Sequence, residues 1–150
     1  MSSILDEPVC LDTNQFIFAI RRSTEYSACR EIIRHHIQKL EIFWPLEILI
    51  ELHRNLYPQE IKAAYRILRG ARELVEDFAP IETTMLEHYE HMGAKDGDAR
   101  ICAHLHSAGI HWLISANRDF LHGLGELPFI VLTSSGGAGY FDGLAARRPM

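Results

Sequence analysis

Short apolar runs alternate along the chain with longer segments in which apolar residues recur every three or four positions. Each short run predicts a β-strand, and the runs cover residues 7–11, 42–44, 112–114 and 128–132. The longer segments predict helices over residues 13–20, 26–40, 45–56, 58–77, 83–91 and 99–108. Strands separated by helices are typical of a parallel sheet covered on both faces. The pattern therefore predicts an α/β fold, a three-layer α/β/α sandwich whose central, mainly parallel sheet has four to five strands.

Capping and turn residues mark where several of these elements begin and end. Thr13 or Asn14 is placed to cap the first helix, and Pro45 suits the first turn of the third. Gly109 is expected to end the last helix, because glycine readily adopts the left-handed conformation found at helix ends. The final strand is continuously apolar, as buried parallel strands are. The composition of residues 134–150 predicts a flexible tail.

The length and composition favour one globular domain over residues 1–150. The chain has 150 residues, of which 47% are hydrophobic, which is enough for one core but not comfortably for two. The amino-terminal segment lacks the basic and apolar regions of a secretory signal, and no apolar run reaches the ~18–20 residues that a membrane helix needs. Three widely spaced cysteines without a C-x-x-C motif fit a reducing compartment. We therefore expect a cytoplasmic protein without a membrane partner.

Polar residues gather where a parallel sheet would hold a ligand, at the carboxyl ends of strands near the point where strand order reverses. The candidates follow the first and third strands, lie inside an apolar helical stretch or open the last helix: Asp12, Glu51, Asp96, Asp98, Ser115, Asn117 and Asp119. A buried carboxylate is costly unless it is paired, and a divalent cation shared by several carboxylates removes that cost. Oxygen ligands in such a cluster suit Mg²⁺ or Mn²⁺ rather than zinc.

Each of these residues also has a purely structural interpretation. Asp12 and Asp98 could cap the helices that follow them. Glu51 could face solvent and pair with Arg54 or its neighbour one turn on, and the polar residues after the third strand could form an ordinary turn. A receiver-like phosphate-transfer domain also gathers aspartates at strand ends, but it needs a lysine late in the chain and none follows Lys95. Several acids at strand and helix ends of one domain favour a shared site.

Three segments resemble the PIN domain family. Residues 9–17 resemble its opening strand, which delivers an Asp followed by a small hydroxylic residue and Asn. Residues 45–52 resemble its second element, a helix that carries a Glu among apolar neighbours. Residues 96–120 resemble its third block, in which an Asp opens a small-residue helix followed by a Gly, an apolar strand and an Asp-Phe pair. The resemblance covers about residues 9–132, with the motifs in the expected order.

The resemblance implies a Mg²⁺- or Mn²⁺-dependent endoribonuclease that hydrolyses single-stranded RNA, often the toxin of a toxin–antitoxin pair. It implies that the catalytic acids are Asp12, Glu51, Asp98 and, at the fourth position, Asn117 or Asp119. Since a carboxylate binds a divalent ion better than a neutral amide does, Asp119 is the expected metal ligand, beside Asp12 and Asp98. Supporting positions next to these acids are Asn14, Asp96, Ser115 and Asn117. Some PIN domains lack activity, so the alternative is an inactive module that binds RNA or a protein.

Basic residues are expected to rim an acidic site that binds RNA. Because the net charge is −5, such a surface must be local. The candidate RNA contacts are the end of the first helix and one helical stripe, namely Arg21, Arg22, Lys62, Arg66 and Arg69; the stripe also fits a solvated helix face. The resemblance further allows a homodimer and an antitoxin partner. A helical segment of that antitoxin would cover an apolar groove near the helices over 24–39 and 58–77.

Overall fold

The computed structural model describes residues 6–115, 127–133 and 136–137. Its strands are β1 (Val9–Leu11), β2 (Glu41–Pro45), β3 (Glu73–Asp77), β4 (Trp112–Ile114) and β5 (Ile130–Leu132). The helices of the described residues are α1 (Thr13–Ile20), α2 (Ser27–His35), α3 (Leu46–Asn55), α4 (Pro58–Arg69), α5 (Thr83–His91) and α6 (Asp96–Ala108), with a 3₁₀ turn, η1, over Ile37–Lys39. The strands form one sheet in the order β3-β2-β1-β4-β5, and every neighbouring pair is parallel.

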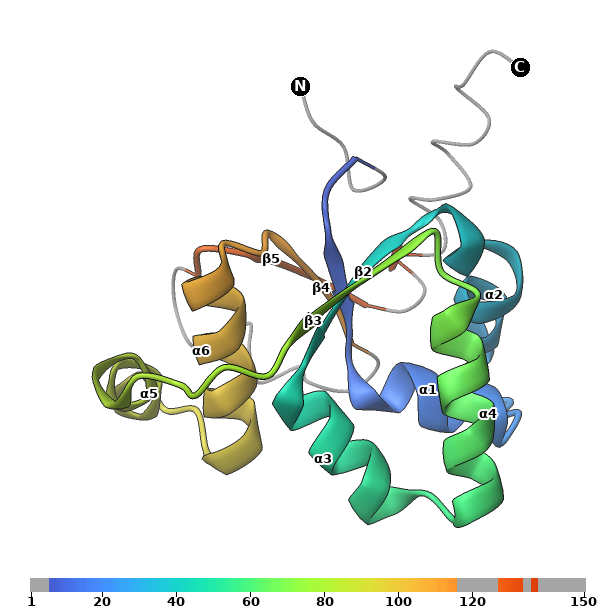
Figure 1. The fold of residues 1–150 in the computed structure, drawn as a ribbon, viewed down its shortest axis with the longest axis horizontal. Helices are drawn as coiled ribbons and strands as arrows, with labels where there is room; N and C mark the ends of the chain where they lie inside the picture. Colours follow the sequence, from blue (N-terminus) through green and yellow to red (C-terminus); the bar gives the residue numbers. More distant parts are fainter. Residues whose placement is uncertain (1–5, 116–126, 134–135, 138–150) are drawn as a thin grey trace.

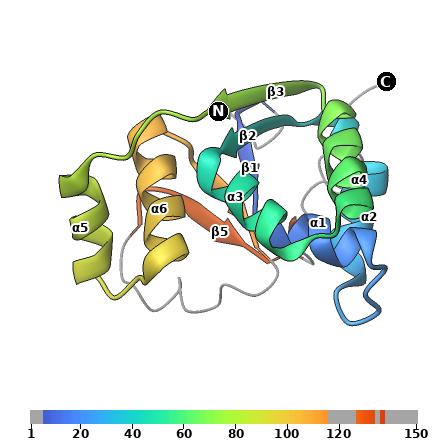
Figure 2. The same ribbon diagram turned by 60° about the horizontal axis from the view of Figure 1, so that its bottom comes forward.

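The helices lie on both sides of this sheet, which confirms the predicted three-layer α/β/α sandwich. Figure 1 shows α5 and α6 on one side and α1, α2 and α4 on the other, with α3 below the carboxyl ends of the strands. The same separation is visible after rotation in Figure 2. Within the part of the chain that the structure describes, no helix combines the length and the apolar character needed to cross a membrane.

The order of the strands places a ligand-binding position between β1 and β4. From β1 the chain moves outward through β2 to β3, and it then returns to the other side of β1 to add β4 and β5. The backbone N–H of Asp12 donates to the carbonyl of Ile114 at 2.9 Å, so these two strands stay together to their carboxyl ends. In open parallel sheets such a reversal leaves a crevice outside the strand ends. The residues that directly follow β1 and β4 therefore line the candidate site.

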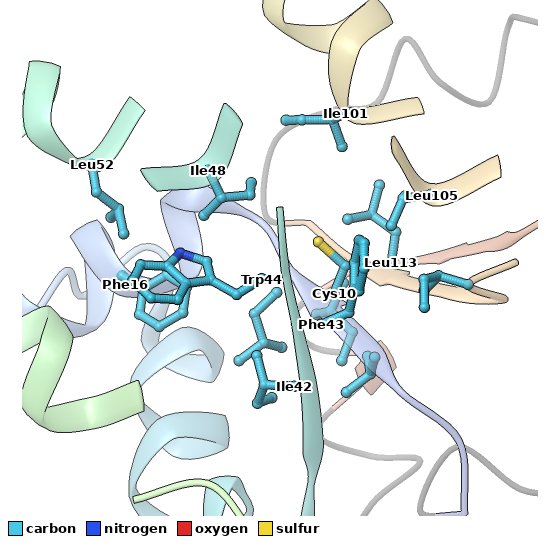
Figure 3. Close-up of a cluster of buried hydrophobic side chains, with 14 of the residues drawn as sticks. Cys10, Phe16, Ile42, Phe43, Trp44, Ile48, Leu52, Ile101, Leu105 and Leu113 are labelled. Carbon is cyan, nitrogen blue, oxygen red and sulfur yellow. The ribbon is translucent and has the colours of Figure 1, made fainter. Parts of the chain in front are cut away.

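Side chains on the two faces of the sheet build the core. Figure 3 shows Ile42 and Trp44 on one side of β2, toward Phe16, and Phe43 on the opposite side, toward Leu105 of α6. All five side chains are buried. The alternation follows from the two-residue period of a strand, and both faces are apolar because helices cover both. The central strands are thus held rigidly behind the site.

Residues 73–77 form the edge strand β3, so the prediction that the helix over 58–77 continues to residue 77 was wrong. The helix α4 ends at Arg69, with Gly70 at its carboxyl end. Val75 continues the helical spacing of Leu68 by coincidence, seven positions on. The five residues of β3 pair in register with β2, from Glu73 beside Glu41 onward. Pairing with β2, about thirty positions earlier, gives this segment its extended conformation. The spacing of apolar residues within the segment does not reveal that pairing.

The ends of several predicted elements also differ from the structure. The cap of α1 is Asp12 rather than Thr13 or Asn14. Pro45 ends β2 and precedes the first residue of α3, instead of lying in its first turn. The helix predicted over 26–40 is divided into α2 and η1.

The predicted end of α6 is confirmed, whereas the last strand is shorter than predicted. Gly109 ends α6 in the left-handed conformation, at φ 69°, as predicted. The strand predicted over 128–132 begins at Ile130 and lies at the sheet edge, where the Ile130 side chain is 51% exposed. The tail predicted over 134–150 lies outside the described residues except for 136–137.

Candidate functional site

Asp12 stands at the carboxyl end of β1, where it is fully buried. Its Oδ1 accepts a hydrogen bond from the backbone N–H of Thr13 at 2.7 Å, which caps α1. Its Oδ2 accepts a hydrogen bond from the Ser115 hydroxyl at 2.7 Å, and Ser115 directly follows β4. The capping interpretation of Asp12 is therefore correct, and it is compatible with a role in the site because the carboxylate lies at the crevice between β1 and β4.

Glu51 belongs to the same polar network through Thr13. The buried Thr13 hydroxyl donates a hydrogen bond to Oε2 of Glu51, which joins the start of α1 to α3. The Glu51 side chain is only partly exposed, and it faces α1 rather than solvent. The two residues that follow β1 thus each place a carboxylate: Asp12 carries its own, and Thr13 orients the carboxylate of Glu51. Both carboxylates lie at the same edge of the sheet.

Glu47 is a candidate site residue that the sequence pattern did not indicate. It lies one turn before Glu51 on α3, and its side chain is 4% exposed. A Cβ atom added to Gly97 would stand 2.8 Å from Oε1 of Glu51 and 3.0 Å from Oε1 of Glu47. The two carboxylates therefore converge on the first turn of α6, where a glycine leaves room for them. The available signal was their i, i+4 spacing, which places both on one face of α3.

Asp98 lies in that same first turn of α6, next to Gly97. One turn further on, burial and, secondarily, the negative charge of Asp12 raise the pKa of Cys102 to about 12. Cys102 is fully buried in the core, so its side of α6 faces the interior of the domain. Asp98 and Cys102 are four residues apart, so they share that face. The positive end of the α6 dipole also favours negative charge at this position.

The supporting residues predicted from the sequence have different surroundings. Ser115 is buried against Asp12, and Asn14 is partly buried in the first turn of α1. Asp96 is exposed and opens α6 with a positive φ of 41°, a conformation that Asp tolerates better than most residues. Asn117 and Asp119 lie outside the described residues. The choice between these two for the fourth acid therefore remains a prediction.

The donor chemistry of the site fits a hard divalent cation. The charged side chains of the candidate site that the structure describes are carboxylates, from Asp12, Glu47, Glu51 and Asp98, and the hydroxyls of Thr13 and Ser115 bind two of them. Among residues 6–115, 127–133 and 136–137, no three His, Cys, Asp or Glu side chains form a ready metal-binding group. Carboxylate oxygens without sulfur or imidazole ligands suit Mg²⁺ or Mn²⁺, and a cation would relieve the repulsion between neighbouring acids. The convergence of two carboxylates beside Gly97 is the observed feature that suits such an ion.

The predicted basic residues lie on α4 and directly after α1. Arg21 is occupied, because its guanidinium donates to the Glu60 carboxylate at 3.0 and 3.1 Å and to the Asn55 carbonyl at 2.9 Å. A groove of about 380 Å³ between α1, α2 and α4 has an apolar floor and four arginines, and its lining residues are Ala19, Ile20, Arg22, Arg30, Ile33, Arg34, Ala63, Arg66 and Ile67. Beside it, a smaller pocket of about 250 Å³ is lined by Lys62, Tyr65, Arg66 and Arg69. Neither of these two surfaces includes any of the acids described above.

The fold is an α/β/α domain with a parallel sheet, and its buried acids lie near the position where the strand order reverses. The sequence model of the PIN domain matches residues 9–123, and the chain belongs to the PIN domain family. A solved structure of VapBC2 from Rickettsia felis bound to a DNA fragment from their promoter is similar in fold, with a TM-score of 0.57 and 17% identity over 83% of this chain and 97% of that chain. No curated protein sequence matches this chain significantly. The family match confirms the resemblance from which the acids were predicted.

Proposed function

We propose that this protein is a metal-dependent ribonuclease that hydrolyses phosphodiester bonds of single-stranded RNA, and that it is the toxin of a toxin–antitoxin pair. The convergence of Glu47 and Glu51 on the first turn of α6, which contains Asp98, carries the proposal, together with the hydrogen bond that joins Glu51 to Thr13, the residue after the buried Asp12. Membership of the PIN domain family supports nuclease chemistry. The likeness in fold to VapBC2 supports the toxin role.

Each acid has a proposed role in this reaction. Asp12, Asp98 and Asp119 would hold Mg²⁺ or Mn²⁺, and Glu51 would act beside them. When bound, such ions activate a water molecule and stabilise the leaving oxygen. The hydroxyl groups of Ser115 and Thr13 hold the carboxylates of Asp12 and Glu51 in fixed orientations. Asn14, Asp96 and Asn117 are the proposed outer supports of these acids.

The cleavage assay that tests this function uses the purified chain and mixed single-stranded RNA. We expect cleavage with Mg²⁺ or Mn²⁺, loss of cleavage in excess EDTA, and recovery when the ion is added back. The ion supplies the activated water and stabilises the leaving oxygen, so it is required for the reaction. Cleavage that continues unchanged in EDTA contradicts the metal dependence. RNA binding without cleavage under every ion supports the inactive module instead.

The groove between α1, α2 and α4 is the proposed binding site of the antitoxin. Its apolar floor fits one face of an amphipathic helix, and its four arginines fit acidic side chains along the edges of that face. It lies between α2 and α4, where the resemblance to the family places a helical antitoxin segment. Lys62 and Arg69, on the neighbouring surface of α4, are retained as proposed RNA contacts.

Charge reversal in this groove is expected to weaken antitoxin binding. The double variant Arg30→Glu with Arg34→Glu should lower the affinity for the product of a small neighbouring gene by more than about tenfold, because like charges across an interface cost several kcal/mol. Calorimetric titration of the purified pair measures the change. Arg72→Glu is the matched control, since Arg72 is exposed and precedes β3 outside the groove. Equal affinities for the double variant and the control would place the antitoxin elsewhere.

A further inference from the structure

A pocket adjoins the carboxylates of the candidate site, and the reaction proposed above does not use it. It has a volume of about 460 Å³, within the range that binds small ligands. It lies between α3, α6 and the segment that leads from β3 into α5, and Figure 2 shows these elements as neighbours. Glu47 lines this pocket and also approaches Gly97 beside Glu51. The pocket and the carboxylate site therefore share a wall.

The pocket carries two positive charges next to this group of acids. Arg54 of α3 and Arg100 of α6 line it, and Arg54 is exposed to solvent. Neither guanidinium forms an ion pair or a hydrogen bond with any other side chain in the described part of the chain. Arginines that lack such a partner and sit beside a polyanion-cleaving site are suited to contact a phosphate, since the planar fork binds two oxygens at once.

The remaining walls of the pocket suit a flat ring with polar edges. Ile50, Ile81 and Leu86 supply apolar surface. His104 is buried in the wall, and burial lowers its pKa although the charge of Asp77 acts in the opposite direction. Its imidazole is therefore neutral at pH 7, with one nitrogen that donates and one that accepts a hydrogen bond.

We propose that this pocket binds one nucleotide of the RNA, immediately next to the phosphate that is cleaved. Arg54 and Arg100 contact the phosphate of that nucleotide, its base packs against the apolar walls, and His104 meets the polar edge of the base. Single-stranded RNA is commonly recognised in this way, through bases that leave the stack and enter a pocket. The inference rests on the proposed ribonuclease function, and it makes Arg54 and Arg100 substrate-positioning residues of that site.

A binding measurement tests the proposal without cleavage. The probe is a fluorescein-labelled single-stranded RNA decamer, titrated in Mg²⁺ with the full-length Asp12→Asn protein and followed by anisotropy. In this background, Arg54→Gln and Arg100→Gln are each expected to weaken binding about tenfold. Each should also reduce the slope of log affinity against log salt by about 0.7, the value for one lost phosphate contact on a single strand. Arg72→Gln, an exposed arginine outside the pocket, is the matched control and should change neither quantity.

Abasic substitution then identifies the nucleotide in the pocket. Removing the base at one position next to the cleaved bond should weaken binding about tenfold. The same removal should have little further effect when Arg100→Gln is present, because the two changes disrupt one contact region and are not additive. Sedimentation of the same variants reports whether a second copy of the chain occupies the pocket instead.

Three outcomes overturn the proposal and differ from one another. If RNA binds and both pocket variants match Arg72→Gln, the pocket does not hold a nucleotide, although the ribonuclease function stands. If the pocket variants change the oligomeric state and leave RNA affinity unchanged, the pocket is a self-association surface. If no variant binds RNA and the unmodified protein does not cleave it with Mg²⁺ or Mn²⁺, the proposed function fails together with this inference.

Discussion

Replacing Asp12 with Asn is expected to lower RNA cleavage by ~100-fold or more while the protein stays folded. Asparagine caps helices about as well as aspartate, so the bond to the Thr13 N–H survives. The other end of the amide can donate to the Ser115 hydroxyl, which reverses the direction of that hydrogen bond. Only the negative charge is lost. We therefore expect the free energy of unfolding in urea to change by less than about 1 kcal/mol.

Asp12→Ala is the informative comparison for this variant. Alanine removes the cap, at about 1 kcal/mol, and leaves the buried Ser115 hydroxyl without its acceptor, at ~1–3 kcal/mol more. The two variants should be equally inactive but clearly different in stability. Full activity of Asp12→Asn would show that this carboxylate only caps α1. Equal destabilisation of both variants would instead assign the loss of cleavage to misfolding.

Addition of Mn²⁺ to the unmodified protein is expected to raise its melting temperature by about 5–10 °C. An ion at a hundred times its dissociation constant stabilises the folded state by ~2.7 kcal/mol, and each kcal/mol shifts the melting temperature of a chain of this size by ~2–4 °C. The effect is favoured here because Glu47 and Glu51 converge on Gly97 and repel each other when no cation is present. Thermal denaturation followed by circular dichroism, in Mn²⁺ and in EDTA, measures the difference.

Variants of individual acids show which of them contribute to this shift. Asp98→Asn and Asp119→Asn are expected to remove most of it, because the charge of a carboxylate is the main attraction for the ion. Asn117→Ala should retain most of the shift and reduce turnover, and the opposite result would make Asn117 the ligand. Glu87→Gln changes an exposed acid of α5 and is the control. A melting temperature that does not respond to Mn²⁺ in the unmodified protein would contradict the proposed cofactor.

The geometry of the acids explains why the prediction of the site from the sequence was incomplete. Glu51 was identifiable because a charged residue inside an apolar stretch is unusual. Glu47 lies in the same stretch, but its importance depends on the approach of Gly97, about fifty positions later in the chain. Similarly, the spacing of Lys62 and Arg66 indicates one helical stripe, whereas only the fold shows that this stripe borders a groove with α1 and α2.

Fold class and most helices could be predicted from the sequence, because they depend on residues close together in the chain. Apolar periodicity defined the α/β class and most of the helices, and the left-handed Gly109 ends α6 where glycine alone indicated it. The conformation of β3 and the contacts of Asp12 depend on residues far away in the chain, so only the folded structure shows them. The strand β3 exists because β2 pairs with it, although its own residues continue a helical pattern. Asp12 caps α1 and also joins the ends of β1 and β4, because Ser115, about a hundred positions later, donates a hydrogen bond to it. Local pattern reports the conformation of a segment, but long-range packing determines which of its polar groups meet.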